Sequence, residues 1–316
     1  MPKTLALALA LAGSLLAAAP AAAADKLTVL LDWFVNPDHA PLLVAEDIGA
    51  FAEAGLDVEI VPPADPAVPP RLVAAGQADI AISYQPQLYF FAEEGLPLVR
   101  IGTLIDTPLN TVIALKSSGI RAIADLKGRK VGFSVSGIEE ATLGDMLQHA
   151  GLSIGDVTMV NVNFQLVASL LAGQVDAVIG GYRNIEVSEL VEQGADPVVF
   201  NVEDHGVPTY DELVIVANRA DLGEDKLKRF LAALAKGTAY LRAHPDETWT
   251  HFAAAHPELD TPVNRRAWSE TIPHFAEDPF TLDVARYEAY GRFLADGKVV
   301  SKLFPIADYA VELKRP

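Results

Sequence analysis

A strand–helix–strand pattern near the beginning of the chain constrains the fold more than any other feature. Residues 27–31 (LTVLL) are a short run of leucine and β-branched residues, residues 41–54 place apolar side chains at helical spacing before Gly55, and residues 56–61 alternate apolar and charged side chains. Two strands that flank one helix at this spacing predict a right-handed βαβ unit, and therefore a parallel sheet. We expect an α/β protein.

A near-repeat indicates two similar halves. Residues 71–83 (RLVAAGQADIAIS) and 169–181 (SLLAGQVDAVIGG) share Ala-Gly-Gln-x-Asp followed by an apolar strand, and Gly173 follows Gly76 by 97 residues. That distance is the size of a small α/β lobe. A helix–glycine–strand junction is common in α/β proteins, but the matching Gln and Asp favour two related lobes.

Two further strand-like runs are placed to carry the chain between such lobes. They are residues 110–116 (NTVIALK) and 212–217 (ELVIVA). Lobe one is then expected to comprise residues 25–109 plus 212–316, and lobe two residues 110–211. The expected architecture is two open, mainly parallel sheets joined by two hinge strands, with a ligand cleft between them.

The amino-terminal residues 1–24 are predicted to be a secretory signal peptide. Lys3 precedes a leucine–alanine run from Leu5 to Ala19, and a small-x-small pattern ends near Ala24. The apolar run of about 15 residues is shorter than the roughly 20 that a membrane-spanning helix needs. We therefore expect export rather than anchoring, and a soluble protein in the periplasm.

Composition excludes several classes of function. The chain has no cysteine, so disulfides, thiolate metal sites and a cysteine nucleophile are impossible. Its 42 acidic and 24 basic residues give a net charge of −18, which argues against a nucleic-acid partner because phosphate binding needs clustered lysine and arginine. Its seven histidines show no metal-ligand spacing. We expect a monomer without a metal or other cofactor.

Several blocks carry a resemblance to a known family. Residues 31–45 (LDWFVNPDHAPLLVA) resemble a signature of periplasmic binding proteins for the thiamin pyrimidine precursor and of the related fungal pyrimidine synthase. Residues 81–85 (AISYQ), 132–140 (GFSVSGIEE) and 180–186 (GGYRNIE) are similar to its other blocks, in the same order. Residues 115–132 resemble the second-lobe entry of class II solute-binding proteins of ABC importers. The likeness covers nearly the whole mature chain.

The resemblance implies a bilobal, type II periplasmic-binding-protein fold and the capture of a flat aminopyrimidine, of the hydroxymethylpyrimidine or formylaminopyrimidine type, for import. It implies an inner-membrane ABC permease as a transient partner and no catalytic activity. The alternatives are another small heterocycle such as riboflavin, a sulfonate-like solute, or the synthase enzyme. The synthase carries a cysteine-rich, iron-linked motif where this chain has residues 180–184 (GGYRN), although His39 falls where the family has a histidine.

The first candidate binding residues follow the first strand. Trp33 is expected at the carboxyl edge of a parallel sheet, where open α/β folds bind ligands, and an indole there can stack on a heteroaromatic ring. The alternative is a core tryptophan. Asn36 and His39 can hydrogen-bond a polar ring substituent or cap the following helix. Asp32 can contact the ligand or anchor the loop.

A second candidate group lies at the end of the strand predicted at residues 78–83. Ser83 and Gln85 offer hydrogen bonds, and Tyr84 offers an aromatic face or a hydroxyl group. Polar residues before a proline are also typical of an ordinary turn. We favour a binding role because the cluster is expected at the same carboxyl edge as Trp33.

A third candidate group lies in the strand-to-helix turn within residues 132–140. Ser134, Ser136 and the amide of Gly137 are placed to bind an anionic or carbonyl oxygen, as the N–H groups of phosphate-binding turns do. The spacing is neither a Walker motif nor a dinucleotide-binding motif. The milder expectation is one or two hydrogen bonds to the ligand.

The last candidate group follows the strand at residues 176–181. Tyr182, Arg183 and Glu186 are expected at the cleft. A carboxylate such as that of Glu186 can accept N–H bonds from an aminopyrimidine and discriminate strongly, because leaving it unpaired in a closed cleft is costly. The alternative is an ordinary first-turn acid that favours the helix dipole. Arg183 can pair with Glu186 or contact a ligand carbonyl or carboxylate.

Overall fold

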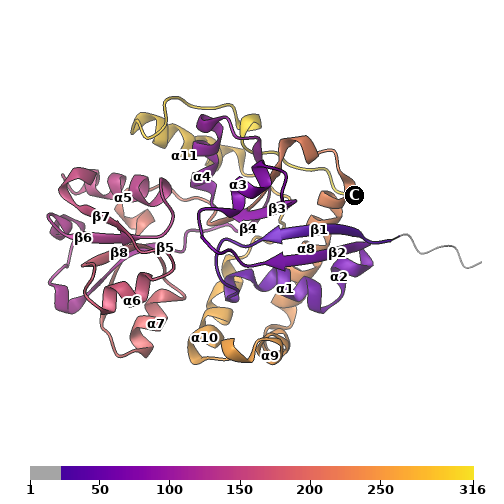
Figure 1. Ribbon diagram of the computed structural model, residues 1–316, viewed down its shortest axis with the longest axis horizontal. Helices are drawn as coiled ribbons and strands as arrows, with labels where there is room; N and C mark the ends of the chain where they lie inside the picture. Colours follow the sequence, from indigo (N-terminus) through magenta and orange to yellow (C-terminus); the bar gives the residue numbers. More distant parts are fainter. Residues whose placement is uncertain (1–22) are drawn as a thin grey trace, which may run out of the picture.

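The computed structural model describes residues 23–316, and these residues form two lobes side by side (Figure 1). The predicted signal peptide, residues 1–24, lies outside the described residues except for its last two positions. None of the helices between residues 23 and 316 combines the length and the apolar character that a bilayer span needs.

Lobe one is built on a five-stranded sheet in the order β2-β1-β3-β10-β4. Its strands are β1 (Asp25–Leu30), β2 (Leu56–Val61), β3 (Ile80–Ser83), β4 (Leu98–Ile105) and β10 (Leu213–Asn218). Strand β1 pairs in parallel with β2 and β3, whereas β10 pairs antiparallel with β3 and β4. All strands except β10 therefore run in one direction.

Lobe two repeats this plan with the sheet order β7-β6-β8-β5-β9. Its strands are β5 (Asn110–Leu115), β6 (Lys130–Phe133), β7 (Thr158–Asn161), β8 (Ala177–Tyr182) and β9 (Pro197–Asn201). Here β5 is the reversed strand, antiparallel to β8 and β9. The reversed strand of each sheet is the first one formed after the chain enters that lobe from the other, so each sheet is mixed although most of its strands share one direction.

Two short segments connect the lobes. Residues 106–109 lead from β4 to β5, and residues 202–212 lead from β9 to β10. The hinges are therefore connections between strand ends, because no strand within residues 23–316 belongs to both sheets. The lobe boundaries at 109/110 and 211/212 stay a prediction.

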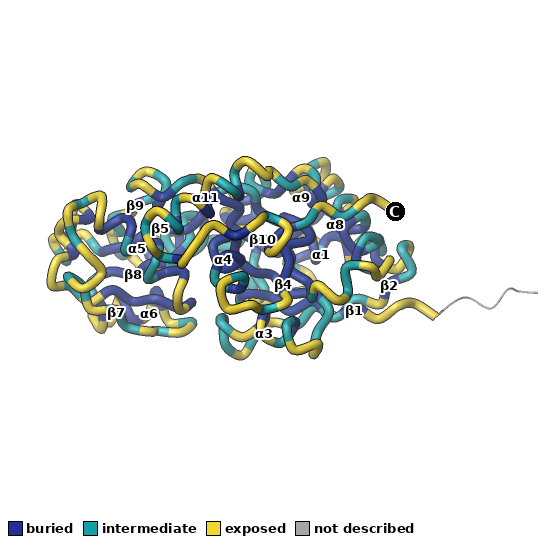
Figure 2. Tube along the Cα trace, turned by 90° about the horizontal axis from the view of Figure 1, so that it is seen from above, coloured by how far each residue is buried: buried dark blue, intermediate teal, exposed yellow. Residues whose placement is uncertain are grey.

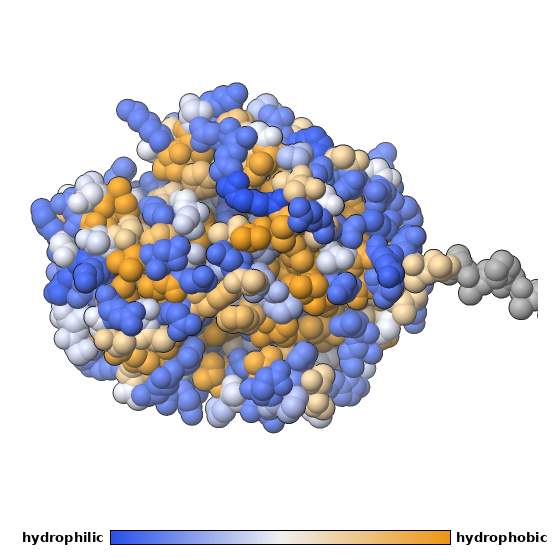
Figure 3. Space-filling view, in the orientation of Figure 1, coloured by the Kyte–Doolittle hydropathy of each residue, from blue (hydrophilic) through white to orange (hydrophobic). Residues whose placement is uncertain are grey.

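Helices cover both sheets (Figures 1 and 2). Around lobe one lie α1 (Ala40–Asp47), α2 (Ala50–Glu53), α3 (Pro69–Ala74), α4 (Gln85–Glu94), α8 (Asp225–Ala243), α9 (Pro245–Ala255), α10 (Pro262–Thr271) and α11 (Val284–Asp296). Around lobe two lie α5 (Ile138–His149), α6 (Leu166–Leu171) and α7 (Glu186–Glu192). The central strands β3, β4, β5, β8 and β10 are mostly buried, whereas β2, β7 and β9 are largely half-buried or exposed. In Figure 3 hydrophilic side chains dominate the outline of the molecule.

The helix predicted at residues 41–54 is broken in two. Helix α1 ends at Asp47 and α2 begins at Ala50, because Gly49 between them has a φ of 73°, in the left-handed region that an α-helix cannot contain. Apolar spacing alone could not reveal this break, because the buried face continues through Ala50 and Phe51.

The near-repeat makes equivalent contacts in the two lobes. The backbone N–H of Thr28 in β1 donates to Asp79 Oδ2 at 2.7 Å, and that of Lys130 in β6 donates to Asp176 Oδ2 at 2.8 Å. Each aspartate thus ties the start of its own strand, β3 or β8, to the neighbouring parallel strand. The orders β2-β1-β3 and β7-β6-β8 correspond, so the two sheets repeat the same arrangement of parallel strands.

Candidate functional site

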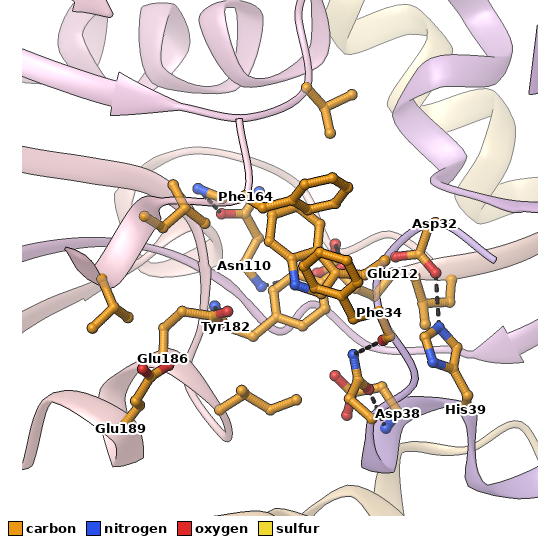
Figure 4. Close-up of a pocket in the computed structure, with 18 of the residues that line it drawn as sticks. Asp32, Phe34, Asp38, His39, Asn110, Phe164, Tyr182, Glu186, Glu189 and Glu212 are labelled. Carbon is orange, nitrogen blue, oxygen red and sulfur yellow. Dashed lines mark hydrogen bonds and ion pairs between the residues drawn. The ribbon is translucent and has the colours of Figure 1, made fainter. Parts of the chain in front are cut away.

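A cavity of about 350 Å³ lies between the lobes, and both contribute to its lining (Figure 4). Lobe one supplies the loop that follows β1, and lobe two supplies the turn after β6, residues 164–168 after β7 and the end of β8. These segments follow the carboxyl ends of parallel strands, where open α/β sheets bind ligands. The cavity is the candidate functional site.

Aromatic rings from both lobes meet at one wall of the cavity. The Trp33 and Phe164 ring centroids are 4.6 Å apart at an angle of 75°, and those of Phe34 and Phe164 are 4.4 Å apart. Phe34 is 52% exposed, so this cluster lies at the mouth of the cavity. Such rings offer flat apolar surfaces against which a planar heterocycle can pack.

The polar side of the lining is acidic. Among residues 23–316 the lining contains no lysine or arginine. It contains six carboxylic side chains: Asp32, Asp38, Glu139, Glu186, Glu189 and Glu212. In Figure 4, Glu186 and Glu189 lie on one side of the cavity, and Asp32 and His39 on the other. This distribution complements a ligand that is rich in N–H donors or carries positive charge, and it opposes an anion.

Asp32 organises the lobe-one side of the cavity. His39 Nε2 lies 2.9 Å from Asp32 Oδ1, and the Tyr84 hydroxyl donates to Asp32 Oδ2 at 2.9 Å. All three side chains are buried, and burial together with the Asp32 charge raises the pKa of Tyr84 well above its usual value. Asp32 therefore anchors the loop, the second of the two roles considered from the sequence.

Glu212 joins the two connections between the lobes. Its Oε2 accepts the backbone N–H groups of Leu109 at 2.6 Å and Asn110 at 2.9 Å, and its Oε1 accepts the Tyr182 hydroxyl at 3.2 Å. Burial raises its pKa to about 7, against the opposing effect of these hydrogen bonds. Because its partners lie on both sides of the hinge, Glu212 holds the connecting segments in one geometry.

Glu186 and Glu139 are the lobe-two carboxyls nearest the strand ends. Glu186 Oε2 accepts the backbone N–H of Tyr182 at 2.7 Å, and burial raises the pKa of Glu186 to about 7. Glu139 is only 5% exposed, and burial raises its pKa to about 8. Both carboxyls therefore bind a proton more readily than an exposed glutamate does, because the cavity disfavours their charged forms.

A hydrogen-bonded contact closes the cleft on one side. Asn184 of lobe two donates from Nδ2 to Asp38 Oδ1 at 2.6 Å and to Thr271 Oγ1 at 2.7 Å, both in lobe one. Thr271 Oγ1 also lies 3.0 Å from Asp38 Oδ1. Burial raises the pKa of Asp38 to about 6. The lobes are therefore held together in a closed arrangement.

The twelve residues that the sequence nominates divide evenly. Six line the cavity: Trp33, Asn36, His39, Tyr84, Tyr182 and Glu186. The other six lie outside its lining: Ser83, Gln85, Ser134, Ser136, Gly137 and Arg183. Among the first six, Asn36 also caps a short 3₁₀ turn, since its Oδ1 accepts the Asp38 backbone N–H at 2.8 Å.

Ser83 and Gln85 point into lobe one rather than into the cleft. The Ser83 hydroxyl donates to Gln87 Oε1 at 2.7 Å, and Gln85 Nε2 donates to the Tyr89 hydroxyl at 2.9 Å. Both side chains are fully buried and hold the first turn of α4. The turn chemistry considered from the sequence explains them.

Arg183 also points away from the cavity. Its guanidinium donates to Glu203 Oε1 at 2.7 Å and to Oε2 at 2.8 Å, so its charge is neutralised within lobe two. The expectation that it pairs with Glu186 or contacts the ligand is corrected, because a bidentate partner lies on the other side.

The turn after β6 offers no serine to the cavity. The Ser134 hydroxyl donates to the backbone oxygen of Asn163, and Ser136 and Gly137 are exposed. The backbone N–H of Gly137 donates to Glu140 Oε2 at 2.5 Å. The residues of this turn that do line the cavity are the apolar Val135 and Ile138 and the acid Glu139.

Sequence reasoning missed Phe164, Asn110, Glu139 and Glu212. Phe164 follows β7, so the rule that favours strand ends could have nominated it. Glu139 lies in the block at residues 132–140, but the serines of that block were predicted to contact the ligand instead. No local pattern marks Asn110 or Glu212, because their position depends on how the two connections meet.

Within residues 23–316, no group of three or more histidine and carboxylate side chains is placed to hold a metal ion. His39 Nε2 is used by Asp32, and its Nδ1 is buried without a hydrogen-bond partner among the described residues. The arrangement around His39 thus anchors a loop.

Residues 36–248 match the NMT1/THI5-like protein family. A Haemophilus influenzae protein provisionally named for thiamine biosynthesis is 49% identical over 296 residues, covering 93% of this chain and 94% of its own. The formylaminopyrimidine-binding protein of Halalkalibacterium halodurans is 36% identical over 79% of this chain and 76% of its own. A Legionella pneumophila protein named 4-amino-5-hydroxymethyl-2-methylpyrimidine phosphate synthase is 27% identical over 90% of each chain.

Solved structures share the architecture. A Candida albicans protein described as having the generic periplasmic-binding-protein fold superposes with a TM-score of 0.70 at 17% identity, covering 93% of this chain and 97% of its own. The alkanesulfonate-binding protein of Xanthomonas axonopodis pv. citri, bound to MOPS, gives a TM-score of 0.73 at 18% identity, covering 92% and 99%. The chain has the periplasmic-binding-protein fold.

Proposed function

Because this chain belongs to the NMT1/THI5-like family, we propose that it captures a thiamin-precursor pyrimidine, of the hydroxymethylpyrimidine or formylaminopyrimidine type, in the cavity between its lobes. It acts as the periplasmic substrate-binding component of an ABC importer. An inner-membrane permease is its transient partner, and the protein is a monomer.

The observation that carries this proposal is the composition of the cavity. Trp33, Phe34 and Phe164 supply flat apolar surfaces, and the rest of the described lining contains six carboxyls and no lysine or arginine. An aminopyrimidine is planar and presents amino N–H donors beside ring nitrogens. Its ring can therefore pack against the aromatic side chains while its N–H groups donate to the carboxyls. Glu186 is the carboxyl that we assign to the amino edge, because Tyr182 engages only its Oε2.

Binding without catalysis is the activity that we propose. The relatives with 49% and 36% identity carry a thiamine-biosynthesis name and a binding-protein name, whereas the synthase-named relative is more distant at 27%. The chain also lacks any cysteine, so a cysteine-rich iron motif cannot form. His39 is committed to Asp32 and to the loop after β1.

Of the alternatives, a sulfonate is disfavoured by the lining. A sulfonate group needs cationic or N–H donors around its oxygens, and the cavity surrounds it with carboxyls instead. The likeness to an alkanesulfonate-binding protein, at 18% identity, concerns the fold alone. A larger heterocycle such as riboflavin remains the competing ligand class for the experiment to test.

Titration calorimetry against four ligands tests the proposal: hydroxymethylpyrimidine, its formylaminomethyl relative, riboflavin and an alkanesulfonate. We expect a dissociation constant below about 1 µM for at least one pyrimidine, together with quenching of tryptophan fluorescence. Glu186→Gln should weaken that affinity about tenfold or more, because the glutamine amide then directs an N–H donor at the amino N–H donors of the ligand. Glu192→Gln, on the exposed side of the same helix, is the matched control. Heat from riboflavin or the sulfonate, and none from either pyrimidine, refutes the proposal.

A further inference from the structure

The turn between β6 and α5 has the shape of an anion-binding turn. It runs from Ser134 to Gly137 and leads into the 12-residue helix α5. The N–H groups at such a position converge and normally attract an oxyanion from a ligand. This turn borders the cavity, since Val135 and Ile138 belong to the lining.

The chain itself occupies these N–H groups. The backbone N–H of Ser134 donates to Glu139 Oε2 at 2.6 Å, and that of Val135 donates to the same oxygen at 3.2 Å. The Gly137 N–H donates to Glu140 Oε2 at 2.5 Å. Carboxyl oxygens of the protein thus take the place that an anionic group of a ligand would fill.

Glu139 is fixed in this position from the other side by Gly180. Oε1 of Glu139 lies so close that a Cβ on Gly180 would approach it to 2.1 Å. Gly180 has a φ of 91°, which a side chain disfavours, and its N–H donates to Asn110 Oδ1 at 3.1 Å. Glu139, Gly180 and Asn110 all line the cavity. The lack of a side chain at Gly180 therefore leaves the space that the Glu139 carboxyl occupies.

We propose that Glu139 acts as a built-in substitute for a ligand anion, and that it makes the cavity specific for pyrimidines that carry no phosphate or other anionic group. This inference deepens the proposed function and rests on it for the identity of the heterocycle. A phosphate monoester entering the cavity meets a filled turn and five further carboxyls, and the part of the chain that the structure describes places no lysine or arginine in the lining. Glu139 is thus a specificity-determining residue.

The exclusion works by occupancy. Oε2 of Glu139 accepts both N–H groups, and burial raises the pKa of Glu139 to about 8, so filling the turn does not depend on a full negative charge. Glutamine has the same shape and the same acceptor oxygen, so Glu139→Gln should exclude phosphate as the native residue does. Alanine leaves the two N–H groups free, so Glu139→Ala should admit it.

The experiment compares hydroxymethylpyrimidine with its phosphate monoester by calorimetry at pH 7. We expect the wild-type protein to prefer the alcohol by about 100-fold or more, Glu139→Gln to keep that preference, and Glu139→Ala to reduce it to about tenfold or less. Glu192→Ala, on the exposed side of α7, is the control and should keep the wild-type preference. The wild-type ratio needs no variant, so it tests the proposal even where Glu139→Ala fails to fold.

Two results overturn the proposal. The first is a wild-type protein that binds the alcohol and the monoester within about threefold of each other. The second is Glu139→Gln admitting the monoester as well as Glu139→Ala does, which assigns the exclusion to charge instead of occupancy.

Orthophosphate separates this inference from the proposed function. It should raise the melting temperature of Glu139→Ala and leave those of the wild-type protein and Glu139→Gln unchanged. That result without binding of either pyrimidine refutes the proposed ligand and keeps the role of Glu139. Binding of the alcohol with no effect of orthophosphate on a folded Glu139→Ala refutes the role of Glu139 and keeps the ligand.

Discussion

Replacing Gly180 by alanine tests the contact between β8 and Glu139 directly. A Cβ at this position would lie 2.1 Å from Glu139 Oε1, well inside contact distance, so the carboxyl must move. The left-handed backbone, with a φ of 91°, costs an alanine about 1 to 2 kcal/mol by itself. Displacing Glu139 leaves the Ser134 and Val135 N–H groups unpaired, which adds about 2 kcal/mol, at about 1 kcal/mol for each lost hydrogen bond.

Gly194 provides the matched control in the same lobe. Its φ is 77°, but a Cβ at Gly194 would meet nothing within 4 Å, so Gly194→Ala incurs only the backbone cost. In urea and thermal unfolding, Gly180→Ala should be less stable than Gly194→Ala by about 2 kcal/mol, which corresponds to about 4 °C in Tm for a chain of this size. Pyrimidine affinity should fall in Gly180→Ala only.

A double-mutant cycle identifies the cause. In the Glu139→Ala background the obstructing carboxyl is absent, so Gly180→Ala should cost no more than Gly194→Ala does. Equal costs for the two glycine variants in the wild-type background refute the steric reasoning. So does an undiminished cost of Gly180→Ala when Glu139 has been removed.

Three further predictions concern the closed cleft. Asn184→Ala removes two hydrogen bonds between the lobes and should weaken ligand affinity by up to about 30-fold, equivalent to about 2 kcal/mol. Small-angle scattering should show a larger radius of gyration for this variant, and an unchanged radius together with an unchanged affinity contradicts the prediction. Four buried carboxyls have raised pKa values of about 6 to about 8 (Asp38, Glu186, Glu212 and Glu139), so the folded protein binds protons more tightly than the unfolded chain does. As far as these four groups are concerned, Tm should be highest below about pH 4.5 and fall as the pH rises to 8. Glu139→Gln should flatten the upper part of this fall, and a Tm that rises over this range contradicts the assignment. Phe164→Ala should reduce ligand affinity, measured by calorimetry, about tenfold, because about 1.4 kcal/mol of aromatic contact is lost. Urea unfolding should change little, and a loss of about 1.4 kcal/mol in the free energy of unfolding would make Phe164 a core residue instead.

Much of the fold could be predicted from local patterns. The alternation of strands and helices indicated α/β lobes, and the near-repeat placed Asp79 and Asp176 in equivalent positions, which the structure bears out through their contacts with β1 and β6. The break at Gly49 could not be predicted, because apolar spacing continues across it. The reversed direction of β5 and β10 depends on the route of the chain between lobes, which no short segment encodes.

Only half of the residues that the sequence nominates line the cavity, and the reason is physical. The rule that ligands bind at the carboxyl ends of strands identifies a stretch of chain but not the direction of each side chain. Tyr84 points into the cavity, whereas its neighbours Ser83 and Gln85 point into the core. The partner of Arg183 is Glu203, which lies on another element, so no local pattern could indicate their pairing.

The network of Asp32, His39 and Tyr84 has a consequence for the order of events in capture. All three belong to one lobe and hold one another, so this wall keeps its shape when the lobes swing apart. A solute that binds first to lobe one would therefore meet side chains whose positions do not depend on contacts with lobe two.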